Sequence, residues 1–285
     1  MKISPIFYMG NKKKLINKGL IDLFPQNINT FVDLFGGSGV VSLNVSARNI
    51  VLNDINENTV NLIKMFAQVK PEELISYIED KINSYNLPTF STDVRKYKGD
   101  REPYKKSYNK LRDDYNTTRD IRLLFLLNIF SNSHMLRYNS SGEFNMPFGN
   151  GYFTDECKKN ILNNTYKNVQ HITNYDFRML KIDKLQEDDF VYLDPPYLNT
   201  TATYNENGGW SESDEEDLYK LCEDLTKKNI RFGMSNVFEN KGVENKKIKK
   251  WCKKNNWNVY TFDDFTYSAC GKGNSNAKEV FITNY

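Results

Sequence analysis

An aspartate, two prolines and a tyrosine leave a predicted strand together, as Asp194-Pro195-Pro196-Tyr197 after the apolar residues FVYL. Successive prolines fix φ and hold the preceding carbonyls in place, which suits a site that aims hydrogen-bond acceptors at a planar amine. The Asp194 carboxylate and the Pro195 carbonyl could hold both protons of an exocyclic amine such as adenine N6, and Tyr197 could stack on the base. The alternative is a rigid turn at the end of a strand, with a buried tyrosine.

A second chemical signal is the GGSG turn at 36–39, which follows the apolar run 31–35. Glycines let the backbone approach a ligand closely at a helix N-terminus. The dinucleotide pattern G-x-G-x-x-G is incomplete, because Ser42 takes its third glycine position, and this argues against NAD. The sequence instead favours a cofactor with a ribose and no phosphate, of which S-adenosylmethionine is the common example. Its sulfonium leaving group needs no protonation, so the chemistry does not require a histidine.

Asp54 ends the second predicted strand, at 49–54. A carboxylate in that place can accept hydrogen bonds from both hydroxyls of a ribose. The alternative is a helix N-cap for the residues that follow. Both interpretations are open at this stage.

The elements that must position these residues are strand 31–35, a helix over 40–47 and strand 49–54, which together predict the βαβ unit of an open, mostly parallel α/β sheet. Ligands of such sheets bind beyond the carboxyl ends of the strands. Further strands are expected at 189–193, 230–236 and 279–283, the last after a turn at 271–276. Helices are expected between the two groups of strands, at 58–69, 71–85 and 104–115.

A stretch rich in Ser, Asn and Gly at 131–153 predicts an exposed hairpin or loop with a turn at 139–142. The predicted organisation is therefore an α/β domain formed by 1–56 and 156–285, interrupted by a segment of helices and loops at 57–155.

Composition excludes several classes of protein. The 285 residues are 39% hydrophobic and 26% charged, which predicts a folded chain. The longest strongly apolar run, 123–130, is far shorter than the roughly 20 residues that span a bilayer, so no membrane partner is expected. The N-terminus lacks a signal-peptide pattern, and we expect a cytoplasmic protein.

Four scattered cysteines and two histidines argue against a disulfide framework, a zinc site and a Ser-His-Asp apparatus, so no metal is expected. The net charge of +3 is small, but basic residues cluster at 96–112 and 241–254, and acidic residues at 211–217. By themselves these clusters are typical of solvated helix faces.

The motifs together resemble the Dam-type, D12 class N6-adenine DNA methyltransferases, most closely the T-even phage branch. Three blocks carry the resemblance: YMGNK at 8–12, FVDLFGGSG at 31–39 with Asp54, and DFVYLDPPY at 189–197. Their order, glycine motif first and DPPY last around an insert, is that of the α group of amino methyltransferases. The resemblance extends through SHMLR, MPFG and SNVFEN, and it implies a Rossmann-like methyltransferase fold.

This resemblance implies a role for each matched residue. Asp194, Pro195, Pro196 and Tyr197 would be catalytic. The methionine end of S-adenosylmethionine would be held by Tyr8, Lys12, Asp33 and the residues Phe35 to Gly39, which include Gly37. Asp54 would bind the ribose of the cofactor. Asp176 and Phe177 would contact its adenine. Without the family, Lys12 would be one more solvated lysine of a KKK run.

The insert is similar to the family's DNA-recognition domain, a helical bundle with a β-hairpin that enters the duplex. The matched hairpin residues are Ser133, Met135, Arg137 and Pro147, of which Arg137 would read a guanine, and the implied target is GATC. Two departures are Asn132 in place of an aromatic residue and Asn150-Gly151 in place of a basic residue. Lysines of 96–112 could contact phosphates instead, which would make binding steeply salt-dependent.

The sequence thus predicts an enzyme that flips adenine from double-stranded DNA and methylates N6, acting as a monomer or a weak dimer. Alternatives are methylation of cytosine N4 or of an RNA adenine, and a DNA-binding module without turnover. Aspartate before PPY favours adenine.

Overall fold

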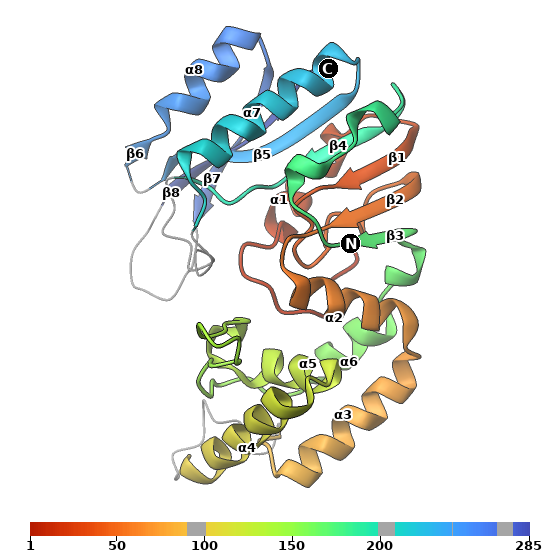
Figure 1. Cartoon of the computed structure of the whole chain (residues 1–285), viewed down its shortest axis with the longest axis vertical. Coiled ribbons are helices and arrows are strands. Elements are labelled where there is room, and N and C mark those ends of the chain that lie inside the picture. The colour runs from red at the N-terminus through yellow and green to blue at the C-terminus, as the bar shows by residue number, and fades with distance from the viewer. Residues whose placement is uncertain (90–100, 199–208, 241, 267–275) are drawn as a thin grey trace. The chain divides into compact units, whose positions relative to one another are not determined.

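A computed structural model describes residues 1–89, 101–198, 209–240, 242–266 and 276–285. The chain divides into two compact units, each discontinuous in sequence (Figure 1). The first contains residues 1–12, 37–43 and 56–172, and the second contains 13–36, 44–55 and 173–285. All of the predicted insert falls in the first unit, together with the YMGNK block. The predicted turn at 271–276 lies almost entirely outside the described residues.

The sheet has the order β3-β2-β1-β4-β5-β8-β7, with β6 paired to β5. β1 is parallel to β2 and β4, β4 is parallel to β5, and β8 is antiparallel to β5 and β7. Its strands are β1 (Ile28–Asp33), β2 (Ala47–Asn53), β3 (His171–Thr173), β4 (Phe190–Leu193), β5 (Arg231–Asn240), β6 (Val243–Glu244), β7 (Asn258–Thr266) and β8 (Asn276–Thr283). This confirms the predicted α/β fold with a mostly parallel central sheet.

One predicted element does not form. The helix expected over 40–47 is a series of turns, and β2 already begins at Ala47. Val40 and Val41 are β-branched, and Ser42 and Asn44 can bond to nearby backbone groups, so this segment has little intrinsic preference for a helix. The glycine turn is therefore followed by an irregular connection between parallel strands.

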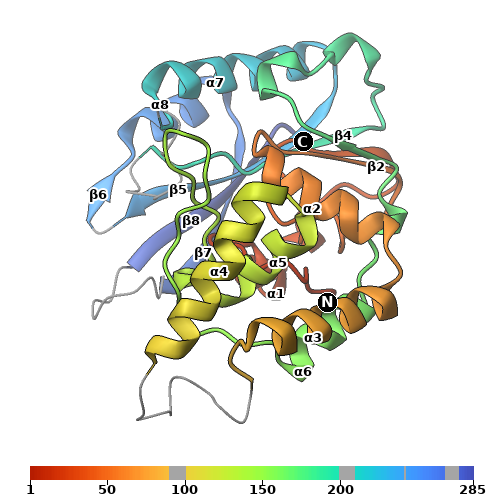
Figure 2. The same ribbon diagram turned by 60° about the horizontal axis from the view of Figure 1, so that its bottom comes forward.

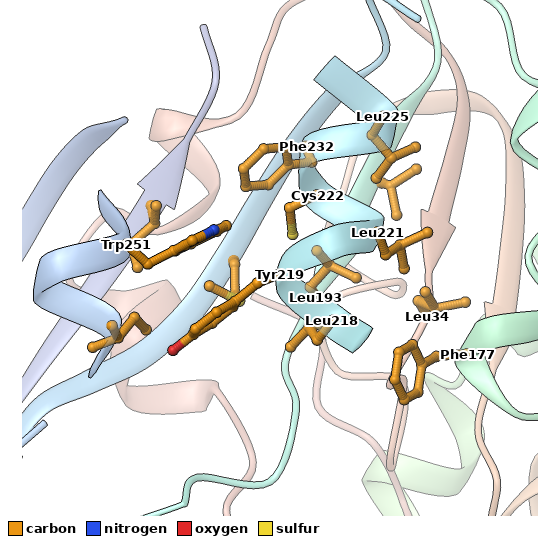
Figure 3. Close-up of a cluster of buried hydrophobic side chains, with 14 of the residues drawn as sticks. Leu34, Phe177, Leu193, Leu218, Tyr219, Leu221, Cys222, Leu225, Phe232 and Trp251 are labelled. Carbon is orange, nitrogen blue, oxygen red and sulfur yellow. The ribbon is translucent and has the colours of Figure 1, made fainter. Parts of the chain in front are cut away.

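The sheet is covered on one face by α7 (Glu212–Lys227) and α8 (Lys246–Asn255). Leu218, Cys222 and Leu225 recur at helical spacing along α7 and are fully buried, as Figure 3 shows. Tyr219 of α7 stacks on Trp251 of α8 with ring centroids 4.3 Å apart. The acidic stretch 211–217 forms the first turns of α7, where Ser211 and Asp214 make a capping box.

The other face of the sheet carries packed aromatic side chains. Phe24 lies within 5.9 Å, centroid to centroid, of rings in β1, β4 and β8. It follows the short elements α1 (Lys13–Asn17) and η1 (Ile21–Leu23). The sheet of the second unit is therefore buried on both faces, as the apolar strands β1 and β4 predict.

The first unit contains α2 (Glu57–Gln68), α3 (Pro71–Tyr85), α4 (Glu102–Thr118), α5 (Ile121–Phe130), α6 (Asp155–Leu162), η3 (Asn132–His134) and η4 (Tyr166–Asn168), most of which Figure 2 brings forward. The three helices expected in this part of the chain are thus confirmed. The apolar run 123–130 lies in α5 and is buried throughout. Among the described residues, no helix has the length and apolar character needed to cross a membrane.

Candidate active site

The carboxyl ends of β1, β2 and β4 bring three predicted site residues to one edge of the sheet. Asp33 is the last residue of β1 and pairs with Tyr192, while Asp54 and Asp194 directly follow β2 and β4. The chain runs from β1 outward to β2 and returns to the other side of β1 as β4. Such a reversal of strand order opens the crevice in which α/β sheets bind their ligands.

The DPPY segment is held by contacts of its own tyrosine. The Tyr197 hydroxyl donates to Glu279 Oε2 at 3.1 Å and lies 3.5 Å from Asp194 Oδ1. Pro195 is buried, whereas Asp194 and Tyr197 are partly exposed. Tyr197 is therefore not the buried tyrosine of the alternative interpretation, although its hydrogen bonds do hold the turn.

Carboxylates gather around the end of β4. Tyr192 is completely buried, and its hydroxyl lies 2.7 Å from Ser235 Oγ. Burial raises the pKa of Tyr192 well above its usual value, and the carboxylates of Asp194, Asp33 and Glu279 add to this effect. This edge of the sheet therefore keeps Tyr192 neutral and presents hydrogen-bond acceptors.

Asn53, the last residue of β2, joins three segments and was missed in the sequence. Its amide nitrogen donates to the carbonyls of Leu34 and Tyr175, and its side-chain oxygen accepts from the backbone of Tyr175. The glycine turn is tied to the same residue, since the Gly36 amide donates to the Asn53 carbonyl at 2.7 Å. An asparagine near the end of the apolar strand 49–54 was the signal available in the sequence, and the structure shows that it is buried.

Glycine is required where the turn passes β2. A Cβ at position 36 would lie 2.8 Å from the Leu52 side chain. The backbone of Asp54 is held by Thr173 and Asn174, since its amide donates to the Thr173 carbonyl and its carbonyl accepts from the Asn174 side chain. Asp54 does not cap the next helix, because Asn56 caps α2 by accepting from two backbone amides. The N-cap alternative for Asp54 is therefore wrong.

Asp176 and Phe177 lie at the start of η5 (Phe177–Met179), beside an aromatic cluster. Phe35, Phe177 and Trp210 form this cluster, with ring centroids 5.4 to 5.8 Å apart. The indole of Trp210 donates to the buried carboxylate of Glu215 at 2.6 Å. The site thus has an aromatic wall, made of rings tilted or edge-on to one another, next to the Asp176 carboxylate.

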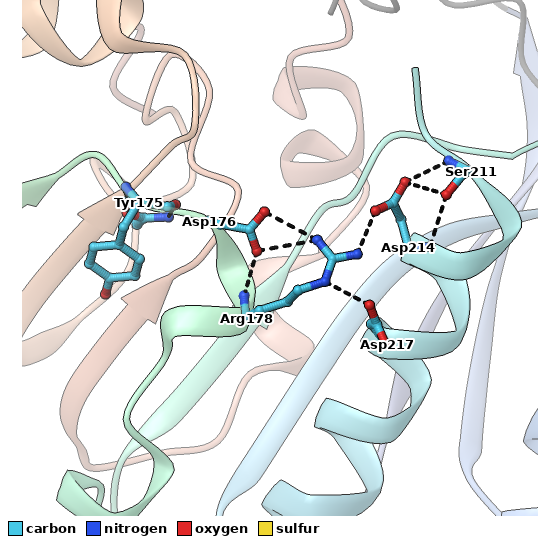
Figure 4. Close-up of polar contacts among 7 residues, drawn as sticks. Tyr175, Asp176, Arg178, Ser211, Asp214 and Asp217 are labelled. Carbon is cyan, nitrogen blue, oxygen red and sulfur yellow. Dashed lines mark hydrogen bonds and ion pairs between the residues drawn. The ribbon is translucent and has the colours of Figure 1, made fainter. Parts of the chain in front are cut away.

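Arg178 joins η5 to the first turns of α7, as Figure 4 shows. Its guanidinium binds Asp214 at 2.5 Å, Asp217 at 2.6 Å and Asp176 at 3.1 Å. It also lies 4.5 Å from the centre of the Phe177 ring. The hydrogen bond to Asp214 is the main cause that raises the pKa of Arg178. We refer to Arg178, Asp176, Asp214 and Asp217 as the Arg178 cluster.

In the first unit, Tyr8 and Lys12 lie in the N-terminal segment. A Cβ at Gly37 would be 2.9 Å from the Tyr8 ring, and Gly37 has a φ of +50°, so glycine is needed there. Lys12 is only 6% exposed. Burial of a lysine is expensive without compensating contacts, so the solvated alternative for Lys12 is wrong.

Asn128 of α5 connects the N-terminal segment to the predicted recognition loop. Its completely buried side chain accepts from the Phe7 amide at 3.0 Å and donates to the carbonyls of Phe7 and His134. The rings of Phe7 and His134 are stacked, with centroids 4.3 Å apart. Asn128 was not singled out in the sequence, where a polar residue inside the apolar run 123–130 was the available signal.

The recognition loop, residues 131–153, is an irregular hairpin. Isolated antiparallel bridges join Ser131 to Phe148 and Tyr138 to Phe144, and the Gly142 amide donates to the Asn139 carbonyl, which confirms the predicted turn. The predicted recognition residues, Ser133, Met135, Arg137 and Pro147, all belong to this loop. Ser133 has a φ of +55°, which is unusual for a residue with a side chain.

The Arg137 guanidinium is held within the loop by Asn145. Its Nε donates to Asn145 Oδ1 at 2.7 Å, and one terminal nitrogen donates to the Asn145 carbonyl at 3.1 Å. Gly151 is required at the base of the loop, because a Cβ there would lie 1.9 Å from the Ile129 carbonyl oxygen. Glycine at position 151 thus has a steric reason in this chain.

One face of α4 supports the loop. Arg101, Tyr108 and Tyr115 are spaced by seven residues, and they contact the Gly149 carbonyl, the Met146 carbonyl and the Tyr138 hydroxyl. The basic segment 96–112 therefore does more than face solvent, although its residues 96–100 lie outside the described part of the chain.

The described cysteines, Cys157, Cys222 and Cys252, are buried free thiols, and burial raises the pKa of Cys252 to about 12. Cys270 lies outside the described residues. Within the described part of the chain, no group of three or more His, Cys, Asp or Glu side chains is arranged to hold a metal ion.

The mixed α/β fold, with its mostly parallel central sheet, is that of a Rossmann-like methyltransferase. A family model for the D12 class N6 adenine-specific DNA methyltransferases matches residues 8–264, and the chain belongs to this family. It is 35% identical to the modification methylase StsI of Streptococcus sanguinis and 34% identical to the type II methyltransferase M.FokI of Planomicrobium okeanokoites, over 99% of this chain and 43% of each relative. It is 27% identical to a DNA adenine methylase of Salmonella typhimurium, over 72% of this chain and 70% of that protein. The chain therefore spans less than half the length of the first two relatives.

Proposed function

We propose that this protein transfers a methyl group from S-adenosylmethionine to adenine N6 in a specific sequence of double-stranded DNA, with the adenine flipped out of the duplex. The observation that carries the proposal is that Asp194 directly follows β4, with Tyr197 beside it, at the carboxyl ends of the parallel strands β1 and β4. Acceptors there can hold the two amine protons, and a partly exposed aromatic ring can stack on a base.

The described residues fit the proposed cofactor. Gly36 and Gly37 pack so closely against Leu52 and Tyr8 that a Cβ would clash, which fixes the path of the turn after β1 where the cofactor would lie. Asp54 would bind the ribose, Asp176 with Phe177 the adenine, and Tyr8, Lys12, Asp33, Phe35 and Gly37 the methionine end. When bound, S-adenosylmethionine supplies an activated methyl group whose leaving group needs no proton.

Each catalytic residue has one task. The Asp194 carboxylate and the Pro195 carbonyl hold the amine protons and turn the nitrogen lone pair away from the ring. Pro196 fixes the backbone between them, and Tyr197 stacks on the base. No side chain has to donate a proton to the leaving group.

We assign DNA recognition to the segment 57–155 and the transfer reaction to 1–56 and 156–285. Ser133, Met135, Arg137 and Pro147 would contact the target, with GATC as the first candidate sequence and Arg137 as the reader of a guanine. We place the protein in the α group, nearest the T-even phage branch, on the order of its motifs. The first two relatives are a modification methylase and a type II methyltransferase. We propose a modification role here too, in the cytoplasm of a bacterium or a phage-infected cell.

The test incubates the protein with labelled S-adenosylmethionine and a plasmid from a host without adenine methylation. Label in N6-methyladenine, with protection of GATC from an endonuclease that cuts only the unmethylated site, is the expected result. Asp194→Ala should abolish transfer and retain cofactor binding. Asp183→Ala, which removes a carboxylate with 84% of its side chain exposed, is the control and should be fully active.

Other outcomes separate the alternatives. Label in N4-methylcytosine or in RNA would replace the proposed substrate. Label in adenine outside GATC, or equal methylation of all single-base variants of GATC, would discard the target but retain the chemistry. Binding of DNA without transfer, unaltered in Asp194→Ala, would favour a DNA-binding module without turnover.

A further inference from the structure

Glu279 is a buried carboxylate in contact with the DPPY segment. It lies on β8, is 1% exposed, and accepts the hydrogen bond from the Tyr197 hydroxyl at 3.1 Å. In sequence it is 82 residues from Tyr197. In the sequence, the only signal of this role is a polar residue inside the apolar final strand.

The sheet is irregular at this position on both sides of β8. Glu279 pairs with Val237 of β5 and with Phe262 of β7, and in each pair of strands the register shifts immediately beyond that partner. Bulges redirect side chains and are common next to active sites. Two bulges that flank one residue are a costly arrangement for a carboxylate with no role beyond packing.

Strand alternation places Glu279 on the same face of the sheet as Tyr192, which lies near the end of β4. Phe281, two residues further on, packs against Tyr192 with ring centroids 6.4 Å apart. Residues two apart in a strand share a face. The neighbouring Lys278 points to the other face, where it pairs with Glu239 at 2.8 Å.

We propose that Glu279 is a positioning residue for methyl transfer, which fixes the ring of Tyr197 in the plane against which the target base stacks. This inference rests on the proposed function. A phenol hydroxyl bound to a buried acceptor cannot rotate the ring away without breaking the bond. Glu279 therefore acts on the reaction through Tyr197, without touching the substrate.

The test combines Glu279→Gln, Tyr197→Phe and the double variant. Tyr197→Phe retains the aromatic ring and removes only the hydroxyl. Each single variant should lower kcat by about tenfold, the loss expected for one hydrogen bond to a charged group, with KM for S-adenosylmethionine nearly unchanged. The double variant should be no slower than either single variant, because both changes act on the same contact, Glu279→Gln by removing the charge of the acceptor and Tyr197→Phe by removing the donor.

The matched control is Glu239→Gln, which changes the neighbouring carboxylate on β5, paired in the exposed bridge to Lys278. It should retain wild-type kcat. Thermal unfolding of each variant separates loss of structure from loss of positioning, and Tyr197→Phe tests the contact without changing a buried charge.

Wild-type kcat in either single variant would overturn the proposal, and so would a double variant whose loss is the product of the two single losses. In both cases the wild-type protein still transfers methyl groups, so the proposed function survives. A wild-type protein without any transfer would overturn the proposed function, and this inference with it.

Discussion

Replacement of Arg178 by alanine should weaken binding of the adenine end of the cofactor. Three carboxylates share one guanidinium, which also covers the Phe177 ring. Without the guanidinium, the three carboxylates of the Arg178 cluster lose the cation that they share, and their negative charges repel one another. The link between η5 and α7 should therefore loosen, and with it the wall formed by Phe177 and Trp210.

The size of the stability loss follows from how exposed the ion pairs of the cluster are to solvent. The Arg178 side chain is 38% exposed and its partners are 24% to 46% exposed, so the pairs are partly screened by solvent. At roughly 0.2–1 kcal/mol for each exposed pair, the variant should lose about 1–2 kcal/mol of unfolding free energy. If cofactor binding must restore this link at a cost of about 1–1.4 kcal/mol, the Kd of the cofactor should rise by about five- to tenfold.

The assay is calorimetric titration with S-adenosylhomocysteine and with 5′-methylthioadenosine, which has the adenosine but lacks the amino acid. Both Kd values should rise by the same factor in Arg178→Ala, whereas Lys12→Ala should affect only S-adenosylhomocysteine. Lys228→Ala, which removes an exposed ion pair between η6 (Ile182–Lys184) and the end of α7, is the control and should alter neither Kd. Unchanged Kd values in Arg178→Ala, despite lower stability, would refute the reasoning.

The Arg178 cluster also predicts that the stability difference between wild type and Arg178→Ala depends on pH. Burial by itself would raise the pKa of Asp214, but hydrogen bonds from Ser211 and Arg178 hold it below its usual value. A carboxylate whose pKa is lowered by folding stabilises the protein above its unfolded pKa of about 4, and this contribution disappears as the pH falls through the folded pKa. The difference in unfolding free energy between wild type and Arg178→Ala should be full at pH 7 and shrink below about pH 4. A difference that grows on acidification would contradict this assignment.

Three further predictions concern other parts of the chain. Arg137→Ala should lose about 1–3 kcal/mol of discrimination at one guanine. The measurement is the ratio of kcat/KM on the target to kcat/KM on its single-base variants. An unchanged ratio would exclude Arg137 as the residue that reads the guanine. Asn128→Ala leaves the backbone of Phe7 and His134 without its buried partners and should cost about 2–4 kcal/mol in denaturant unfolding, with a loss near zero arguing against the link. Glu215→Ala removes the acceptor of the Tyr219 hydroxyl and should destabilise by about 1–3 kcal/mol in the same assay, where wild-type stability would show that water replaces the carboxylate.

The sequence by itself determined the elements whose signals are local. The central strands, helices α2 to α4 and the turn at 139–142 were predicted because apolar periodicity and turn residues act over a few neighbouring residues. The DPPY and glycine motifs were found for the same reason, since each is contiguous. The helix expected over 40–47 failed because a parallel βαβ pattern was assumed where the residues themselves have weak helix preference.

Only the tertiary structure decided what surrounds these motifs. Asn53 contacts the carbonyl of Tyr175 across 122 residues, and Glu279 accepts from Tyr197 across 82. Lys12 lies in a run of lysines that looks solvated, yet it is buried. Such contacts depend on which strands become neighbours, and strand order is set by burial of the whole sheet rather than by any segment of it. The residues that position a site are for this reason the least visible in its sequence.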